Sequence, residues 1–492
     1  MKNSAIKKKA VAGAKWSLIE SLLRQGITFV VGIILARLLS PAEYGQIGII
    51  MVFIAVFNIF IDSGFTDAMI RKNNATEEDY NTVFVINLFV SCVCALIFYL
   101  SAPYIGIFFH DPSLTPLARA MSVIVIISSL AIVQRIKLVK RVDFKTQAKI
   151  SLTSTTTSGI FGISLAYMGY GVWALVAQQI SNQIINTISL WLFNRWVPNF
   201  SFNKNSFKEL WGFGCNILAS QLLNAIWKQI YQIVIGRFYQ PASLGLYTRA
   251  HQFPHLVSTN ITRVVQRVSY PVFSMVQDEP DVLKSGYKRV VKTTMLIVAI
   301  VMMGLFACAK PMVYVLLGEK WIKCVPFIQI LCISFMIHPL HSINLNGIAV
   351  KGRSDLCLRL EIIKKCISVI PICIGIFIDI FTMLISSTII SFLTYYINAY
   401  YAKPLLNYGI KEQIKDIIPS LAVGGIMCML IWPITLLHIH SAIQFVLQFF
   451  GGAIISITLC HIFKLREYYE ILEIITPTLH KLKLDKLITL IK

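Results

Sequence analysis

The chain has 492 residues, of which 56% are hydrophobic and only 14% charged, and its formal net charge is +22. Soluble globular domains carry about 25% charged residues, and disordered chains cannot be this apolar, so both classes are excluded. A nucleic-acid-binding protein shares the basic balance but not the hydropathy. The composition indicates an all-α, polytopic membrane protein, because lipid offers the backbone no hydrogen-bond partner.

Apolar segments recur along the whole chain, and about fourteen of them have the roughly 20 residues that cross a bilayer as a helix. The expected spans are 16–38, 46–68, 81–105, 116–134, 150–168, 171–194, 209–236, 245–274, 292–317, 324–349, 361–379, 381–402, 414–437 and 440–463. The first span contains Glu20 and Arg24, which the apolar core of a cleavable signal peptide would not. We therefore expect it to stay in the membrane.

The distribution of Lys and Arg tests this topology. With a cytoplasmic N-terminus, 34 of the 45 cations fall on the inner side and six on the outer side. Positive charge marks the cytoplasmic side of membrane proteins, and one missed helix would invert every later loop. The pattern predicts cytoplasmic N- and C-termini and makes a nucleic-acid partner unnecessary. The tail at 464–492 alternates leucine with lysine, which favours an amphipathic helix on membrane lipid over a partner-binding tail.

A short pattern occurs twice, 200 residues apart. The first copy contains Arg37, Pro41, Ala42 and Gly45, and the second contains Arg237, Pro241, Ala242 and Gly245. Proline ends one helix and glycine permits a tight turn into the next, although chance similarity between two apolar turns is an alternative. Six spans separate the copies, so the repeat would be parallel. We predict two six-helix lobes, 1–200 and 201–404, an appended helix pair at 405–463 and the tail at 464–492.

Polar side chains interrupt several expected spans, where they are costly unless they face protein or water. The cations are Arg24, Lys228, Arg249 and Arg263, and the polar residues grouped with them are Glu20, Asn224, His255, Thr259, Gln266, His338 and His341. No acid lies within a helical turn of Lys228 or Arg263, so these two favour a hydrated cavity for an anion such as phosphate. Glu20 and Arg24 are four residues apart, and a structural ion pair explains them equally well.

Other candidate sites are weaker. Asp62 lies near the end of the second span and is a candidate for ion coupling, although helix capping is the better-supported interpretation. The spacing of His338 and His341 is a weak metal signal. The chain contains no GxGxxG, P-loop, HExxH or GxSxG motif. We therefore expect no catalytic site, no metal and no cofactor.

Several of these segments resemble one family. The sequences at 36–45 (ARLLSPAEYG), 62–65 (DSGF), 244–250 (LGLYTRA) and 270–273 (YPVF) are similar to those of Wzx-type polysaccharide flippases, in particular the subgroup that exports colanic and teichuronic acid precursors. The resemblance covers residues 10 to about 465. It implies membership of the multidrug/oligosaccharidyl-lipid/polysaccharide exporter superfamily and a V-shaped pair of lobes around an arginine-rich cavity.

The resemblance also implies a function. Such proteins move undecaprenyl-pyrophosphate-linked oligosaccharide across the bacterial inner membrane toward the polysaccharide polymerase machinery. By carry-over, Arg24, Lys228, Arg249 and Arg263 would hold the pyrophosphate and nearby sugar, while the lobes rock about the turns at Pro41 and Pro241.

Three alternatives stay open. A cation-coupled multidrug exporter of the same superfamily would need acids in its cavity. A membrane polymerase or glycosyltransferase would need a large outward loop or an acidic catalytic loop. A non-transporting scaffold would not need Lys228 and Arg263 inside the bilayer.

Overall fold

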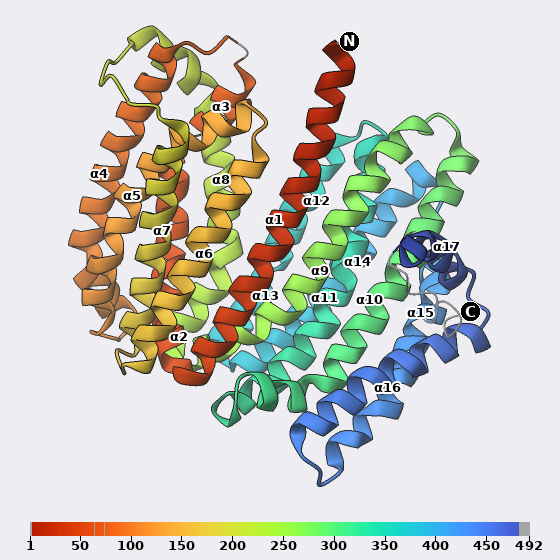
Figure 1. Cartoon of the computed structure of the whole chain (residues 1–492). Helices are drawn as coiled ribbons and strands as arrows, with labels where there is room; N and C mark the ends of the chain where they lie inside the picture. The colour runs from red at the N-terminus through yellow and green to blue at the C-terminus, as the bar shows by residue number, and fades with distance from the viewer. Residues whose placement is uncertain (1, 63, 73, 482–492) are drawn as a thin grey trace. The chain divides into compact units, whose positions relative to one another are not determined.

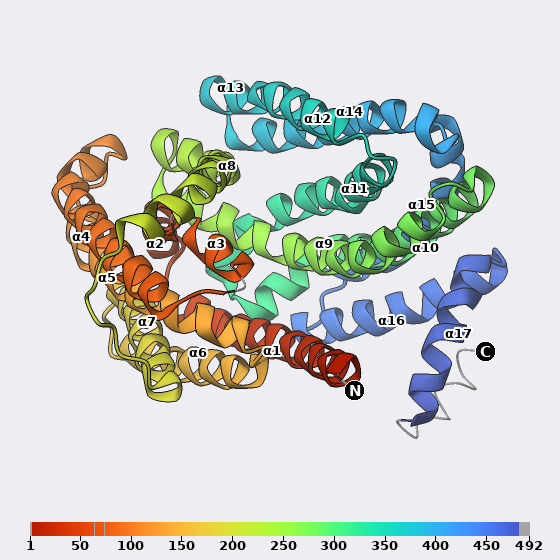
Figure 2. The ribbon, with the colours of Figure 1, turned by 90° about the horizontal axis from the view of Figure 1, so that it is seen from above.

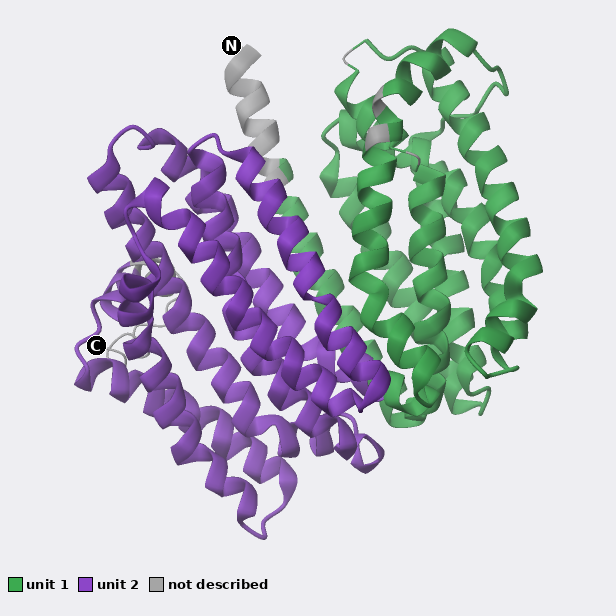
Figure 3. Ribbon diagram, turned by 180° about the vertical axis from the view of Figure 1, so that it is seen from behind, with its two compact units in different colours: residues 1–245 green, residues 246–492 purple. Residues whose placement is uncertain are grey.

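A computed structural model describes residues 2–62, 64–72 and 74–481, and all regular secondary structure in these ranges is helical (Figure 1). Seventeen α-helices and two short 3₁₀ helices follow one another in this part of the chain. They divide into two compact units, residues 1–245 and 246–492 (Figure 3). The expected all-α class is confirmed.

Unit 1 is a bundle of eight helices within the described residues. They are α1 (Lys2–Leu38), α2 (Pro41–Asp62), α3 (Phe65–Arg71), α4 (Glu77–Phe108), α5 (Leu114–Lys140), α6 (Phe144–Tyr167), α7 (Val172–Asn194) and α8 (Lys204–Phe238). α4 packs on α5, α6 on both α1 and α7, and α2 on both α5 and α8. Because α8 packs on α2, α3 and α4, the compact unit continues to Gly245, beyond the lobe boundary that we expected at residue 200.

Local hydrogen bonds and ion pairs fix the end of unit 1 where α3, α4 and α8 meet. Thr76 and Asp79 form a capping box: the Thr76 hydroxyl accepts from Asp79 N at 3.3 Å, and Thr76 N donates to Asp79 Oδ2 at 2.9 Å. Lys72 Nζ lies 3.0 Å from Asp79 Oδ2 and 2.9 Å from Glu209 Oε2. These contacts satisfy the first N–H groups of α4 and connect it to the start of α8.

The expected second span, 46–68, is not one continuous helix. α2 ends at Asp62 and α3 begins at Phe65. Gly64 has a φ of 68°, a left-handed conformation that glycine adopts without strain. A β-carbon at Gly64 would lie 2.5 Å from the Gly214 carbonyl oxygen of α8. The close approach of α8 therefore requires glycine at this position, which lies between α2 and α3.

Unit 2 contains most of α9 and all later helices that the structure describes. They are α9 (Pro241–Met275), α10 (Pro280–Leu316), α11 (Val325–Val350), α12 (Ser354–Ile367), α13 (Val369–Phe377), α14 (Ile380–Leu406), α15 (Ile410–Ile431), α16 (Ser441–Ile462) and α17 (Arg466–Lys481). α10 packs on α11, α15 and α16. Figure 2 shows α12, α13 and α14 on one side of this unit and α16 and α17 on the other. Of the expected tail, residues 482–492 lie outside the described residues.

A buried polar network joins four helices of unit 2. The Tyr287 hydroxyl of α10 donates to Asn344 Oδ1 of α11. Gln413 Nε2 of α15 donates to the same oxygen at 3.2 Å, and the Tyr395 hydroxyl of α14 donates to Gln413 Oε1 at 2.8 Å. Asn344, Gln413 and Tyr287 are at most 1% exposed. Buried polar groups need such partners, because an unmade hydrogen bond costs the full desolvation of the group.

Nine helical stretches in the described part of the chain are long and apolar enough to cross a membrane. They are Lys15–Leu38, Pro41–Arg71, Glu77–Phe108, Leu114–Lys140, Pro280–Leu316, Glu319–Val350, Ile380–Leu406, Ile410–Leu436 and Ser441–Ile462. The other expected spans also fall on helices, namely α6, α7, α8, α9 and the pair α12–α13. These helices are not among the nine because polar side chains lower the mean hydropathy of α6 to α9. The last segment is divided at Ser368 into the two short helices α12 and α13.

Candidate functional site

The two copies of the repeated pattern form the same turn. α1 ends at Leu38 and α2 begins at Pro41, while α8 ends at Phe238 and α9 begins at Pro241. The backbone hydrogen bonds repeat with the same offset: Leu39 N to Leu35 O (2.8 Å) and Tyr44 N to Ser40 O (3.3 Å) in the first copy, Tyr239 N to Ile235 O (3.0 Å) and Leu244 N to Gln240 O (3.4 Å) in the second. Sequence similarity here therefore reflects similar backbone geometry.

The two turns also pack against each other inside unit 1. A β-carbon built on Gly45 would lie 1.8 Å from the Pro241 carbonyl oxygen, and one built on Gly245 would lie 1.8 Å from the Pro41 carbonyl oxygen. Only glycine permits this approach of one backbone to another. The sequence predicted both turns but not their contact, which joins segments 200 residues apart.

The cation of α1 has a local partner. Arg24 Nε lies 3.1 Å from Glu20 Oε1, with the Arg24 side chain 51% exposed. The same Glu20 oxygen accepts from the Ser151 hydroxyl of α6 at 2.9 Å. Glu20 therefore anchors α1 to α6 and orients Arg24. This ion pair uses one guanidinium nitrogen, Nε, and leaves the Arg24 side chain half-exposed.

Sequence reasoning missed one cation near this position. The expected span 116–134 ends one residue before Arg135, but α5 continues to Lys140, and the charge of Arg135 interacts with those of Asp62 and Arg24. Ile136 and Leu138, both buried, continue the apolar pattern beyond Arg135 and could have indicated the longer helix. Asp62 itself accepts a hydrogen bond from Thr66 N at 3.3 Å, which fits the helix-capping interpretation.

α8 places Lys228 and Asn224 on an exposed face of unit 1. Gln221, one turn earlier, donates weakly to Asp67 Oδ2 of α3 at 3.5 Å. Within the described residues Lys228 forms no ion pair with an acidic side chain. Its charge is therefore not neutralised by the unit in which it lies.

α9 carries the remaining cations in unit 2. Arg249 Nη1 donates to Gln252 Oε1 at 2.7 Å, and Arg263 Nη1 approaches Asn260 Oδ1 at 3.3 Å. Arg263 and Gln266 are exposed. The Thr259 hydroxyl donates to the His255 carbonyl oxygen, one turn earlier, at 2.7 Å. Threonine hydroxyls inside helices commonly form this hydrogen bond. Among the described residues, Arg263 has a neutral partner and no acidic one.

The histidines lie in two different surroundings. His255 stacks on His251 with ring centroids 4.9 Å apart, and both pack edge-on against Phe335 of α11. His338 contacts the same Phe335 ring at 6.1 Å. His341 instead faces α14, with Nδ1 3.1 Å from Asn398 Nδ2 and Nε2 3.4 Å from Ser391 Oγ. The described residues contain no group of His, Cys, Asp or Glu arranged to hold a metal ion.

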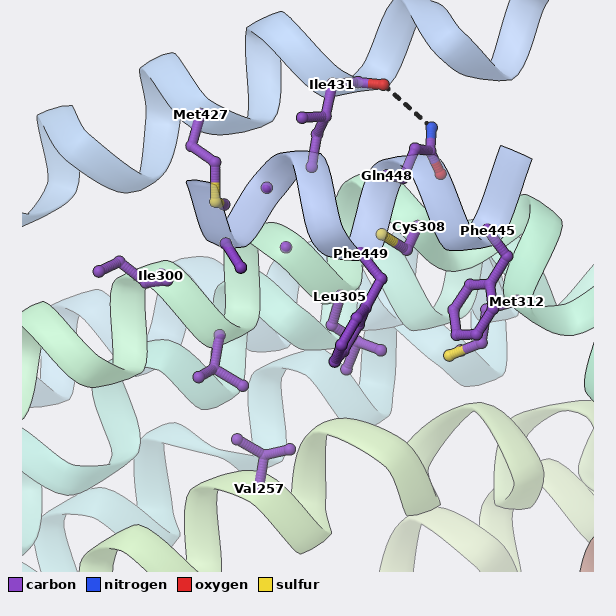
Figure 4. A pocket seen from close by; sticks show the side chains of 14 residues that line it. Val257, Ile300, Leu305, Cys308, Met312, Met427, Ile431, Phe445, Gln448 and Phe449 are labelled. Atoms are coloured by element: carbon purple, nitrogen blue, oxygen red, sulfur yellow. Dashed lines mark hydrogen bonds between the residues drawn. The ribbon is translucent and has the colours of Figure 1, made fainter. Parts of the chain in front are cut away.

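An apolar cavity of about 340 Å³ lies between α10, α15 and α16 (Figure 4). Its walls are formed by Leu305, Cys308, Met427, Phe445, Phe449 and their apolar neighbours. The polar exception is Gln448, whose amide nitrogen donates to the Ile431 carbonyl oxygen at 3.0 Å and to Thr435 Oγ1 at 2.7 Å. No charged side chain lines it, so this cavity suits a hydrocarbon chain and not a phosphate.

The proposed substrate cations are thus divided between the units. Arg24 and Lys228 belong to unit 1, and Arg249 and Arg263 belong to unit 2. Within the units, the structure brings Glu20 to Arg24, and His255 and His338 to one phenylalanine. A common cavity for all four cations stays a prediction.

Known structures of similar fold include two membrane transporters. The fold is similar to that of the lipid II flippase MurJ in an inward closed conformation, with a TM-score of 0.72, 13% identity and coverage of 91% of this chain and 98% of that chain. It is also similar to an inward-facing multidrug resistance MATE family transporter of the MOP superfamily, with a TM-score of 0.59 and 14% identity over 78% of this chain and 96% of that one. Identities this low show a shared fold.

The family follows from the sequence comparison. A family model described as polysaccharide biosynthesis protein matches residues 34–326, more than half of the chain, and the chain belongs to this family. Relatives include the teichuronic acid biosynthesis protein TuaB of Bacillus subtilis, 27% identical over 72% of this chain and 73% of that protein. The lipopolysaccharide biosynthesis protein WzxC of Escherichia coli is 22% identical over 75% of this chain and 76% of its own length.

The family match confirms the expected relationship to polysaccharide biosynthesis proteins, and the nine candidate membrane-spanning stretches in the described part of the chain agree with a multi-pass membrane protein.

Proposed function

We propose that this protein is a flippase that moves undecaprenyl-pyrophosphate-linked oligosaccharide across the bacterial inner membrane for surface polysaccharide biosynthesis. The observation that carries the proposal is the combination of family membership with two cations, Lys228 and Arg263, on polar helices and without acidic partners among the described residues. Cations inside a membrane protein are costly. An anionic substrate headgroup would compensate for that cost.

The relatives support the same substrate class. TuaB is named for teichuronic acid biosynthesis, WzxC for lipopolysaccharide biosynthesis, and the succinoglycan transport protein ExoT of Rhizobium meliloti is 26% identical over 65% of this chain and 65% of that protein. One solved structure of similar fold is a lipid II flippase. A glycan attached to a lipid is the substrate that agrees with both observations, the relatives named for polysaccharide biosynthesis and the fold shared with a lipid flippase.

Three of the acids within the expected spans argue against export of a cationic drug. Glu20 is paired with Arg24 and receives the Ser151 hydroxyl. Asp62 accepts from Thr66 N, and Asp379 accepts from Thr382 N at 2.8 Å as the N-cap of α14. A cation-coupled exporter needs a free acid in its cavity. These three acids already have structural partners.

The mechanism that we propose is alternating access by two lobes related by the parallel repeat, with about fourteen spans and both termini in the cytoplasm. Arg24, Lys228, Arg249 and Arg263 would bind the pyrophosphate while the prenyl chain stays in lipid. The turns at Pro41 and Pro241 would act as the pivot. Their matched hydrogen bonds and glycine contacts support that role, because a close backbone contact resists separation but permits rotation.

The test is binding of undecaprenyl pyrophosphate to the purified protein, followed by native mass spectrometry. We expect Lys228→Gln and Arg263→Gln each to weaken binding about tenfold or more, because each removes a charge-assisted contact worth roughly 1.5–3 kcal/mol. Arg353→Gln is the matched control, since Arg353 pairs with Asp355 at 2.8 Å outside the expected spans. Binding unchanged in both cavity variants would overturn the assignment, and selective binding of a cationic drug instead would favour a multidrug exporter.

A further inference from the structure

Two pockets of opposite character adjoin where α17 meets α9 and α10. The first, of about 400 Å³, is lined by Val264, Val265 and Val268 of α9 and by Val290 of α10. The second, of about 360 Å³, is lined mainly by charged side chains of α10 and α17. Arg289 and Glu470 line both. An apolar volume therefore borders a charged one, which is the layout that an amphipathic ligand requires.

The charged pocket carries more positive than negative charge. Its cations are Lys288, Arg289, Lys292 and Arg466, and its acids are Glu467 and Glu470. Arg289 Nε and Arg466 Nε share the single carboxylate of Glu470, at 2.7 and 3.1 Å, while Lys292 pairs with Glu467. Lys288 pairs with Asp416 of α15 at 3.1 Å. Even when Asp416 is included, the cations outnumber the acids by one. This excess positive charge lies on Arg289 and Arg466, which share Glu470.

These guanidinium groups are accessible. The Arg466 side chain is 86% exposed and that of Arg289 is 62% exposed. Each uses Nε for Glu470 and keeps its terminal nitrogens for another acceptor. Two forked donors at one carboxylate are well suited to hold a phosphate oxygen as well.

A hydroxyl inside the apolar pocket provides an independent indication of a ligand. Ser269 lines this pocket, is 2% exposed, and its Oγ has no hydrogen-bond partner in the described part of the chain. A buried hydroxyl without a partner costs free energy, and most serine hydroxyls in helices donate to a carbonyl of the preceding turn. An ester carbonyl at the head of an acyl chain would supply the missing acceptor.

We propose that this junction is a binding site for an anionic glycerophospholipid. The phosphate lies between Arg289 and Arg466, an ester carbonyl accepts from Ser269, and an acyl chain runs along Val264, Val268 and Val290. Lipid is the source of the phosphate because Val264 and Val268 are each 60% exposed and leave an apolar surface beside the cations. The charged residues also precede the apolar part of α10, at the depth where headgroups meet basic side chains.

The bound lipid would connect α17 to α10 and α9. Glu467 and Glu470 already attach α17 to α10 through ion pairs, and Tyr468 and Leu465 pack beside Leu296 and Val423. The lipid adds a third element, because its chain contacts α9. This site is separate from the proposed substrate cations, and the inference does not rest on the proposed function.

The experiment uses the full chain, purified and delipidated in detergent, and native mass spectrometry with dioleoyl phosphatidylglycerol or dioleoyl phosphatidylcholine as probe. We expect phosphatidylglycerol to bind at least tenfold more tightly. Arg466→Gln should weaken phosphatidylglycerol binding about tenfold, and Val268→Glu should weaken it similarly by placing a carboxylate at the chain. Arg353→Gln, which removes an exposed arginine paired elsewhere, should leave binding unchanged.

Three results would overturn the proposal. Equal binding of the two lipids would remove the role of the anionic headgroup. Equal binding by wild type, Arg466→Gln and Val268→Glu, with all three showing the same thermal unfolding midpoint, would place the lipid elsewhere. Displacement of phosphatidylglycerol by millimolar inorganic phosphate would show that the site takes a free anion and not a lipid.

Discussion

Gly45 and Pro241 belong to turns 200 residues apart, yet the α-carbon of Gly45 faces the Pro241 carbonyl oxygen so closely that a β-carbon would lie 1.8 Å from it. Gly245 has the same relationship to the Pro41 carbonyl oxygen. The contact is reciprocal, as expected when two copies of one motif meet about an approximate two-fold axis. It explains why each turn contains a glycine at this position.

We expect Gly45→Ala and Gly245→Ala each to destabilise the protein by at least about 1–3 kcal/mol, the usual cost of overpacking, because the opposing atom is backbone and cannot rotate away. Thermal unfolding of the purified variants would measure this. Gly451→Ala in α16 is the control, since no atom lies within 4 Å of its β-carbon position. A Gly45→Ala protein as stable and as active in export as the control would contradict the contact.

The pair Glu20 and Arg24 offers a test that separates structure from binding. Arg24→Gln removes the half-exposed guanidinium, and Glu20→Gln removes only its partner at 3.1 Å. Exposed ion pairs contribute little stability, so both variants should fold. We expect Arg24→Gln to weaken binding of undecaprenyl pyrophosphate and Glu20→Gln to preserve it. Equal loss in the two variants would show that binding requires the intact Glu20–Arg24 pair and not the Arg24 charge alone.

The contrast between turns and cavity shows what the sequence could predict. Hydropathy located helices because every spanning segment must satisfy its own backbone, and proline marked both repeated turns. The contact between Glu20 and Arg24 was also predictable, because residues four apart lie next to each other on a helix. The break at Gly64 and the electrostatic interaction between Arg135 and Asp62 depend on packing between distant helices. No local pattern encodes such contacts.

Two substitutions of Asp62 distinguish a helix-capping role from an ion-coupling role. Its carboxylate accepts from Thr66 N at 3.3 Å, and an amide oxygen can accept the same bond. We expect Asp62→Asn to keep both the folded protein and export, while Asp62→Ala loses roughly 0.5–2 kcal/mol of stability, as for other lost helix caps. Export assays in cells, with membrane protein levels measured in parallel, would decide. A well-folded Asp62→Asn protein without export would assign Asp62 to ion coupling.

For the network of Tyr287, Asn344 and Gln413, we expect the losses of stability in single and double variants to be strongly non-additive. Gln413→Leu leaves Asn344 and the Tyr395 hydroxyl without a shared partner, because Gln413 Nε2 lies 3.2 Å from Asn344 Oδ1 and Gln413 Oε1 lies 2.8 Å from the tyrosine. Each buried group left unpaired costs about 1–3 kcal/mol. We therefore expect a large drop in the thermal unfolding midpoint for this single variant.

Replacing both amides should cost less stability than the sum of the two single changes. Asn344 and Gln413 are hydrogen-bonded to each other, so each single variant breaks this bond and leaves the other amide without this partner. The double variant Asn344→Leu/Gln413→Leu removes both amides together. Gln277→Leu is the matched control, since Gln277 is exposed and its substitution should leave the midpoint unchanged. Additive losses in the double variant would show that the two amides act independently. Smaller, coupled losses would identify the network as the element that holds α10, α11, α14 and α15 together while the protein moves its substrate.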